Sequence, residues 1–312
     1  MDNKAIIKWL LEGDVSIQYQ VNRDLLSADK KDLQNRISAE GWGKQFLSKR
    51  NPDGHWGLKF YQPKWISTHY TLLDLRNLCI HPENTLIKQS IRIILDNEKG
   101  PDGGIRPIGA KQKCDVCING MFLNYAAYFG AEENLLQSVV DFILKERMPD
   151  GGFNCNLNTV GATHSSLHTT LSVLEGIYEY ESNGYSYRLA ELKEAERSSR
   201  AFILVHQLFL SDRTGEVIQK SFLKLPYPSR WKYDILKALD YFQHSGFQWD
   251  DRIKPAIEIL IKKRKTDNRW PLQAKHPGQV HFEMEPAGKS SRWNTLRALR
   301  VLKHFKIENN DR

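Results

Sequence analysis

Features that mark secreted and membrane proteins are missing from this 312-residue chain. No run approaches the roughly 20 consecutive apolar residues that a membrane-spanning helix needs. Residues 1–14 hold only a short apolar stretch, interrupted by Lys8, and no small-residue cleavage site, so they do not resemble a signal peptide. These absences predict a cytoplasmic protein with no stable membrane insertion.

Cysteine is also scarce. The four cysteines are Cys79, Cys114, Cys117 and Cys155. In a chain without a secretion signal, a disulfide framework is not expected. Metal ligation and plain burial are therefore the two interpretations left for these residues.

Charge of one sign is not concentrated anywhere, although the formal net charge is +8. The lysines and arginines are spread along the chain, and their densest cluster, residues 262–265, ends a predicted helix. Cations at a helix C-terminus interact favourably with the helix dipole, so this cluster does not indicate a polyanion site. We expect no nucleic-acid partner.

What the sequence does contain is a repeated turn. Asn-Pro-Asp-Gly at 51–54 recurs as Pro-Asp-Gly-Gly at 101–104 and 149–152, with weaker echoes at 212–215 and 266–270. Proline presets φ, aspartate caps its own backbone, and glycine accepts a positive φ. The first three turns are spaced 49 and 48 residues apart, which is the period of a helical pair.

Each turn leads to a segment in which apolar residues recur at helical spacing. Five such segments share one register when they are aligned on His69, Cys117, His168, Tyr233 and Trp293, and a less regular one covers 17–26. Amphipathic segments alternate with them at 2–12, 31–49, 84–97, 133–146, 187–210 and 251–264. The alternation predicts an all-α fold, an (α/α)6 toroid of inner and outer helices around a central cavity. Because no Gly/Ser-rich linker divides the chain, we expect one domain over residues 1–312.

The turns and helix starts such as Leu-His-Thr-Thr-Leu at 167–171 resemble the terpenoid cyclase and protein prenyltransferase superfamily of α/α toroids, known for prenyltransferase and squalene oxidase repeats. Segment 43–56 is similar to the Gln-Trp repeat of squalene cyclases. The resemblance covers nearly the whole chain and implies the toroid fold, which does not by itself fix function. The Asp-x-Asp-Asp acid of those cyclases and the Asp-Asp-x-x-Asp motif of prenyl synthases are both absent. These departures count against ordinary terpene cyclisation.

Zinc-dependent protein prenyltransferases carry an Asp-x-Cys at one inner-helix start and a histidine at a later one. Asp115, Cys117 and His168 match those places, and Lys111 lies just ahead, where the family has basic residues for a diphosphate. The resemblance implies a zinc-dependent transferase whose ligand is small and apolar or prenyl-diphosphate-like.

The predicted metal ligands are Cys114, Cys117, Cys155 and His168. Cys117 and His168 hold equivalent repeat positions, and thiolates with an imidazole are ligands that zinc prefers. With all four residues as ligands, the tetrahedral zinc would be fully coordinated and structural. With Asp115, Cys117 and His168 as ligands, the zinc would keep one coordination position open for water or a substrate thiol. The alternative is that the cysteines are small buried hydrophobes and His168 is a core residue.

A second candidate group precedes the last inner helix. His281, Glu283 and Glu285 alternate with apolar residues and would share one side, as acid, base or ligand groups near the cavity mouth. Arg230 and Arg292 stand in similar Ser-Arg-Trp segments. Their side chains suit either of two roles, the binding of an anionic head group or the capping of backbone carbonyls. With the aromatic helix starts, the predicted substrate-binding residues are Trp65, His69, Tyr70, Lys111, Arg230, Trp231, Tyr233, Arg292 and Trp293.

The leading functional hypothesis is a zinc-binding, prenyltransferase-like or terpenoid-cyclase-like toroid that acts on an isoprenoid or lipid-like substrate at the turn end of the ring. One alternative is a non-enzymatic lipid- or peptide-binding module with a structural zinc. The other is a carbohydrate-active (α/α)6 enzyme, which needs paired carboxylates across the cavity. The candidates for such a pair are Glu283, Glu285 and Asp74.

Overall fold

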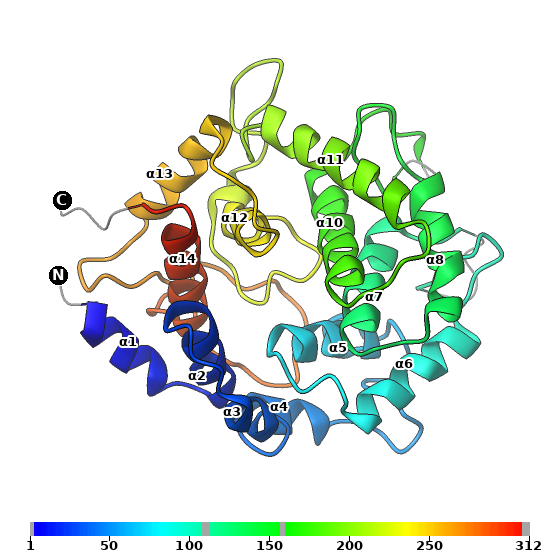
Figure 1. Cartoon of the computed structure of the whole chain (residues 1–312), viewed down its shortest axis with the longest axis horizontal. Helices are drawn as coiled ribbons and strands as arrows, with labels where there is room; N and C mark the ends of the chain where they lie inside the picture. The colour runs from blue at the N-terminus through cyan, green and yellow to red at the C-terminus, as the bar shows by residue number, and fades with distance from the viewer. Residues whose placement is uncertain (1–2, 108–112, 157–159, 308–312) are drawn as a thin grey trace.

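Helices arranged in two concentric layers form a closed ring in the computed structural model, which describes residues 3–107, 113–156 and 160–307 (Figure 1). The inner helices are α2 (Val15–Gln20), α5 (Thr68–Asn77), α7 (Val116–Tyr128), α10 (Leu167–Ser182), α12 (Ile235–His244) and α14 (Arg292–His304). The outer helices are α1 (Asn3–Leu11), α3 (Lys31–Arg36), α4 (Gly41–Leu47), α6 (Thr85–Asn97), α8 (Glu133–Lys145), α11 (Leu189–Val205) and α13 (Lys254–Lys262). In these residues β-structure is limited to isolated bridges. The predicted all-α toroid is confirmed.

The two layers differ in how much of each helix is buried. The outer helix α6 buries one stripe, which includes Ile87, Ile91 and Ile94, and exposes the rest. The inner helix α7 is buried at every position except Cys117 and Tyr128. A helix with one apolar stripe covers a core, whereas a helix that is apolar on most sides lies within it.

The ring closes where the two ends of the chain meet. Helix α14 packs against α2 and against the π-helical turn η1 (Val21–Leu25) that continues it. The Gln20 side chain then donates to the Asn77 carbonyl at 3.0 Å, which links α2 to α5. Figure 1 shows the first inner helix, α2, beside the last one, α14.

The repeated turns have the predicted conformation. Gly54, Gly103 and Gly151 have φ values of +88°, +90° and +94°. The residue that follows each turn is held by a side chain near the start of the next inner helix: the backbone N–H of Phe153 donates to Thr170 Oγ1, as that of Trp270 does to Thr295 Oγ1, both at 3.0 Å. These contacts fasten each outer helix to the inner helix that comes after it.

The register of the first repeat differs from the prediction. Thr68 accepts from the Trp56 N–H at 3.0 Å, as Thr170 does from Phe153. Thr68 is therefore the equivalent of Thr170, which places His69 one helical turn away from the position of His168. The reason is local, because a 3-10 turn at Lys64–Ile66 takes the place of the first turn of α5.

Helices α7 and α10 approach each other closely at a pair of glycines. A Cβ atom on Gly120 would lie 2.6 Å from the Ser172 carbonyl oxygen, and one on Gly176 would meet the Gly120 carbonyl. Both neighbours are backbone atoms in helices, so they cannot move aside as a flexible side chain would.

Gly120→Ala is therefore expected to lower the free energy of unfolding by about 1–3 kcal/mol, the usual cost of overpacking. In a solvent-exposed helix the same change would stabilise the protein by up to about 1 kcal/mol. A loss of stability, in place of this gain, therefore indicates the close contact between α7 and α10. Urea unfolding measures it, with Asn134→Ala on the exposed side of α8 as the control. A Gly120→Ala protein as stable as the parent would contradict the close packing.

The turn end of the ring is covered by the segment between α13 and α14. Trp65 Nε1 donates to the Pro277 carbonyl at 2.6 Å, and Thr71 Oγ1 lies 2.9 Å from His281 Nε2. These contacts fold residues 275–285 over the starts of the inner helices. No helix in the described part of the chain is long and apolar enough to cross a membrane.

Candidate functional site

A cavity of about 400 Å³ lies at the centre of the ring. All six inner helices contribute to it, most of them through their C-terminal halves, and it therefore lies away from the turn end where the sequence placed the function. Its described lining contains six cations and four carboxylates: Arg23, Arg76, Arg230, Lys237, Arg297 and Arg300, with Asp24, Glu175, Glu179 and Asp240. Tyrosine and tryptophan rings complete the wall, from Tyr128, Tyr178, Tyr227, Tyr241 and Trp293.

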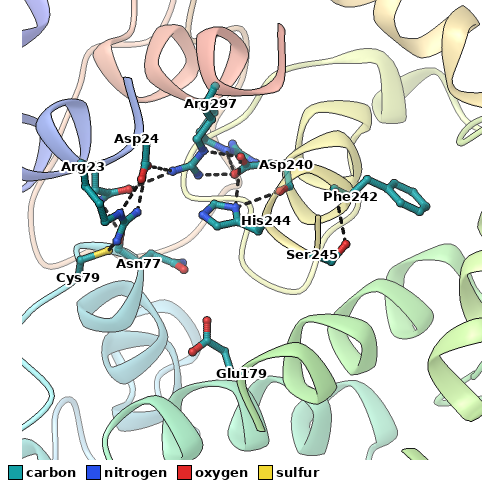
Figure 2. A network of polar contacts seen from close by, with 12 residues as sticks. Arg23, Asp24, Asn77, Cys79, Glu179, Asp240, Phe242, His244, Ser245 and Arg297 are labelled. Atoms are coloured by element: carbon teal, nitrogen blue, oxygen red, sulfur yellow. Dashed lines mark hydrogen bonds and ion pairs between the residues drawn. The ribbon is translucent and has the colours of Figure 1, made fainter. Parts of the chain in front are cut away.

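Asp240 on α12 is at the centre of a buried ionic network (Figure 2). Its carboxylate accepts from Arg297 Nε at 3.1 Å and from Arg300 Nε and Nη2 at 2.5 Å each. Burial alone would raise the pKa of Asp240, but the charges of Arg300 and Arg297 and the hydrogen bonds from Arg300 hold it well below the usual range. The Arg300 guanidinium also reaches Asp24 Oδ2 at 3.0 Å, so one network joins α12, α14 and η1.

The other cavity carboxylates are also paired with cations. Glu179 pairs with Arg76 across the cavity, and Glu175 Oε2 lies 3.1 Å from Lys237 Nζ. Asp24 accepts from Arg23 and from Arg300, and these partners hold its pKa below the usual value although burial raises it. Each of the four carboxylates therefore has at least one cation within salt-bridge distance.

His244, at the end of α12, is a neutral histidine in this cavity. Burial, with the Arg300 charge, lowers its pKa to about 4, although Asp240 opposes the shift. Its Nδ1 lies 3.0 Å from the Asp240 backbone carbonyl. Because a carbonyl only accepts hydrogen bonds, the ring proton sits on Nδ1, and Nε2 keeps its lone pair. The Tyr178 ring of α10 faces it with 6.4 Å between centroids.

Four buried donors of cavity-lining residues have no hydrogen-bond partner in the described residues: Arg76 Nε, Arg230 Nε, Arg297 Nη1 and Trp293 Nε1. Arg230 is 6% and Arg297 5% exposed, so solvent reaches little of either side chain. Asp74 lies 3.9 Å from Arg230, and burial raises its pKa to about 6 against that charge. Buried donors are nearly always satisfied in folded proteins, so this corner of the cavity has unused capacity for an anion.

Comparison with known proteins supports the fold. The structure of a polysaccharide lyase matches with a TM-score of 0.53 at 12% identity, over 93% of this chain and 89% of that chain. The fold is that of an α/α toroid. The type II terpene cyclase MstE from Scytonema gives TM-scores of 0.45 without ligand and 0.47 for a variant in complex with its product, merosterolic acid A. Both are 12% identical, over 93–94% of this chain and 87–88% of theirs.

No family model matches the sequence, and the search against curated proteins gives no match. At 12% identity the structural likeness concerns the fold alone. The α/α toroid fold expected from the repeats is therefore supported, and the likeness extends neither to the expected superfamily nor to its activities.

The predicted zinc ligands are only partly brought together. Cys155 Sγ accepts from the Cys117 N–H at 3.0 Å, so these two residues are in contact. Cys114 is buried, and its thiol bonds to Asp102. His168 Nδ1 accepts from the Tyr233 N–H at 2.7 Å, and its ring packs against Phe222 and Trp231.

The residues of the predicted zinc site, as arranged, do not fit a four-ligand metal centre. Among the described residues no group of three or more His, Cys, Asp or Glu side chains could hold a metal ion. Asp115, the candidate for an open site, is the N-cap residue of α7. The Cys117 thiol and, less strongly, the Thr169 hydroxyl lower the pKa of Cys155 against the effect of burial.

The three residues predicted as acid, base or ligand groups lie in the segment that covers the turn end. His281 bonds to Thr71, and Glu283 pairs with Lys275. Glu285 accepts from the Ser291 hydroxyl at 2.5 Å and from the Arg292 N–H at 2.7 Å. Glu285 thus secures the start of α14, and none of the three lines the central cavity.

The predicted substrate-binding residues separate into two groups. Arg230 and Trp293 line the central cavity. The others lie elsewhere: Trp65 and Trp231 border a groove at the turn end, His69, Tyr70 and Tyr233 are buried in the wall, and Arg292 donates to the Trp9 carbonyl at 3.0 Å. The last contact is the backbone-capping role that the sequence left open. Lys111 lies outside the described residues.

Most of the cavity charges were missed by the sequence analysis, although a signal for them exists. In the four inner helices whose predicted register is correct, the residue seven places after the leading one is Asn124, Glu175, Asp240 or Arg300. All four line the cavity. A polar residue at the same place in these four helices, two turns beyond the helix start, marks the face that points inward.

Proposed function

We propose that this chain is a carbohydrate-active enzyme that binds an acidic saccharide in the central cavity. The observation that carries the proposal is the charge of the cavity wall, where cations outnumber carboxylates by two among the described residues. A sugar carboxylate or sulfate would take up the unused donors of Arg230 and Arg297 in bidentate or charge-assisted bonds. Sugar hydroxyls suit the remaining donors and acceptors, and the aromatic rings suit the sugar faces.

This proposal adopts the carbohydrate alternative in preference to the isoprenoid one. An apolar chain in the cavity would remove charged side chains from water without offering them partners, which costs several kcal/mol per group. The polysaccharide lyase with the same fold acts, by its name, on a polysaccharide. That likeness is an analogy of fold and supports the proposal only as such.

The reaction that suits these groups is elimination. Hydrolysis by two carboxyl groups needs one of them protonated, and each cavity carboxylate is paired with a cation. His244 instead offers a neutral imidazole with a free lone pair on Nε2. Arginines on a uronate carboxylate stabilise the negative charge that develops when the neighbouring C–H loses its proton. His244 takes that proton, the C–O bond to the leaving sugar breaks, the leaving oxygen takes up a proton from water, and a double bond forms in the ring.

Calorimetric titration of the purified chain tests the proposal with three ligand classes of similar size. We expect an oligouronate to bind, and a neutral oligosaccharide and farnesyl diphosphate to bind weakly or not at all. Turnover of the oligouronate is followed by the ultraviolet absorption of the unsaturated product. Tighter binding of farnesyl diphosphate, or equal binding of the neutral sugar, would contradict the proposal.

Zinc binding and prenyl transfer stay predictions from the sequence. Elemental analysis of the purified protein tests the first, and transfer from a prenyl diphosphate to a thiol acceptor tests the second. No step of the proposed elimination passes through a metal.

A further inference from the structure

Two cysteines from different repeats meet at the turn end, outside the central cavity. Cys117 lies in the first turn of α7, and Cys155 lies in the turn that precedes α10, 38 residues later. Both side chains are partly exposed. The Cys117 N–H and the Cys155 sulfur are 3.0 Å apart, and the two thiols are hydrogen-bonded to each other.

The sulfur of Cys155 receives three hydrogen-bond donors. Besides the N–H and the thiol of Cys117, the Thr169 hydroxyl donates to it at 3.5 Å. The Cys117 N–H belongs to the N-terminal turn of a 13-residue helix, where the dipole favours negative charge. Donors that converge on one sulfur stabilise its thiolate, which is the nucleophilic form.

The other sulfur-containing candidates do not share this environment. Cys114 is 3% exposed, and its thiol bonds to Asp102. Cys79 lines the central cavity and accepts from Arg23, and no other cysteine of the described residues bonds to it. The residues that would complete a zinc site with the pair face other partners.

We propose that Cys117 and Cys155 form a redox-active dithiol that exchanges with low-molecular-weight disulfides. The Cys155 thiolate attacks one sulfur of such a disulfide, forms a mixed disulfide and releases one thiolate, which takes up a proton. The Cys117 thiol then gives its proton to solvent, attacks the Cys155 sulfur and releases the second thiol. The external disulfide is reduced to two thiols, and the protein gains one Cys117–Cys155 disulfide.

Oxidation with glutathione disulfide tests the dithiol on the full chain. Intact-mass spectrometry is expected to show the loss of two hydrogens, and a peptide map is expected to contain a fragment that joins Cys117 to Cys155. The Cys117→Ser variant should stop at the mixed disulfide, with one glutathione on Cys155. The Cys155→Ser variant should lose the linked fragment, and Cys114→Ser should behave as the parent does.

Three results would overturn the proposal: no linked fragment, preferential glutathionylation of Cys79 or Cys114, or stoichiometric zinc that shields both thiols until it is chelated. Circular dichroism of each variant checks that it is folded, and alkylation of the parent with iodoacetamide gives a measurement that needs no variant. Cys155 should be alkylated first. None of these readouts depends on saccharide binding, so either proposal can fail without the other.

Discussion

Replacement of Asp240 by alanine is expected to destabilise the toroid by about 3–5 kcal/mol, the usual cost when one partner of a buried ion pair is removed. Asp240 is 8% exposed and accepts three hydrogen bonds from two arginines. Arg300 would keep Asp24 as a partner, but Arg297 would lose the one carboxylate within salt-bridge distance in the described residues. Chemical denaturation of the parent and of Asp240→Ala measures the difference.

The control is a carboxylate in an exposed pair. Asp96 pairs with Arg92 on the surface of α6, and Asp96→Ala should leave the unfolding midpoint close to that of the parent because solvent screens the pair. An Asp240→Ala protein that unfolds with the same midpoint as Asp96→Ala would show that the network contributes little to stability.

The contribution of the Asp240 charge to stability depends on pH in a defined direction. The pKa of Asp240 is lower in the folded state than its unfolded value of about 3.9. Its ionisation therefore contributes stability that is fully present above about pH 4 and is lost as the pH falls toward the folded pKa. The difference between the parent and Asp240→Asn should be constant near neutrality and should shrink in acid.

The layers of this fold could be predicted from the sequence because each repeat carries its own local signals. The Pro-Asp-Gly turns require a positive φ at Gly54, Gly103 and Gly151, and they have it. The helical spacing of leucines identified the inner helices, whose bounds begin near the predicted leading residues. The one error of register, at His69, arose where a 3-10 turn replaced the first turn of α5, and such a choice depends on tertiary contacts.

The location of the site could not be predicted in the same way. Whether the turn end is open depends on the segment before α14, which is fixed by contacts such as Trp65 with Pro277 and Thr71 with His281. Those contacts join residues more than 200 positions apart. The repeat predicts that Cys117 and Cys155 lie at the same end of the ring, and in the structure they are in contact. The His168 ring accepts a hydrogen bond from Tyr233 instead, and the orientation of a side chain does not follow from the repeat period.

Replacement of His244 by alanine is expected to lower kcat for an oligouronate by about 10²–10⁴-fold, the usual contribution of a general base. KM should change little, since the arginines that hold the carboxylate remain. In the parent, kcat should rise with pH through about 4 and then level off, because His244 accepts a proton only after it has lost its own. Stopped assays of product absorption over a range of pH measure both effects.

A general base and a merely structural histidine differ in this profile. His244→Gln keeps a hydrogen-bonding side chain of similar length, so a structural role would be partly restored by it, whereas proton abstraction would not. His164 is exposed, and His164→Ala should leave kcat and its pH profile as they are in the parent. Retention of turnover in His244→Ala, with the rise near pH 4 unchanged, would assign the base to another cavity residue. The arginine-lined cavity would then still bind the acidic saccharide, because the cations that recognise the carboxylate are separate from the group that removes the proton.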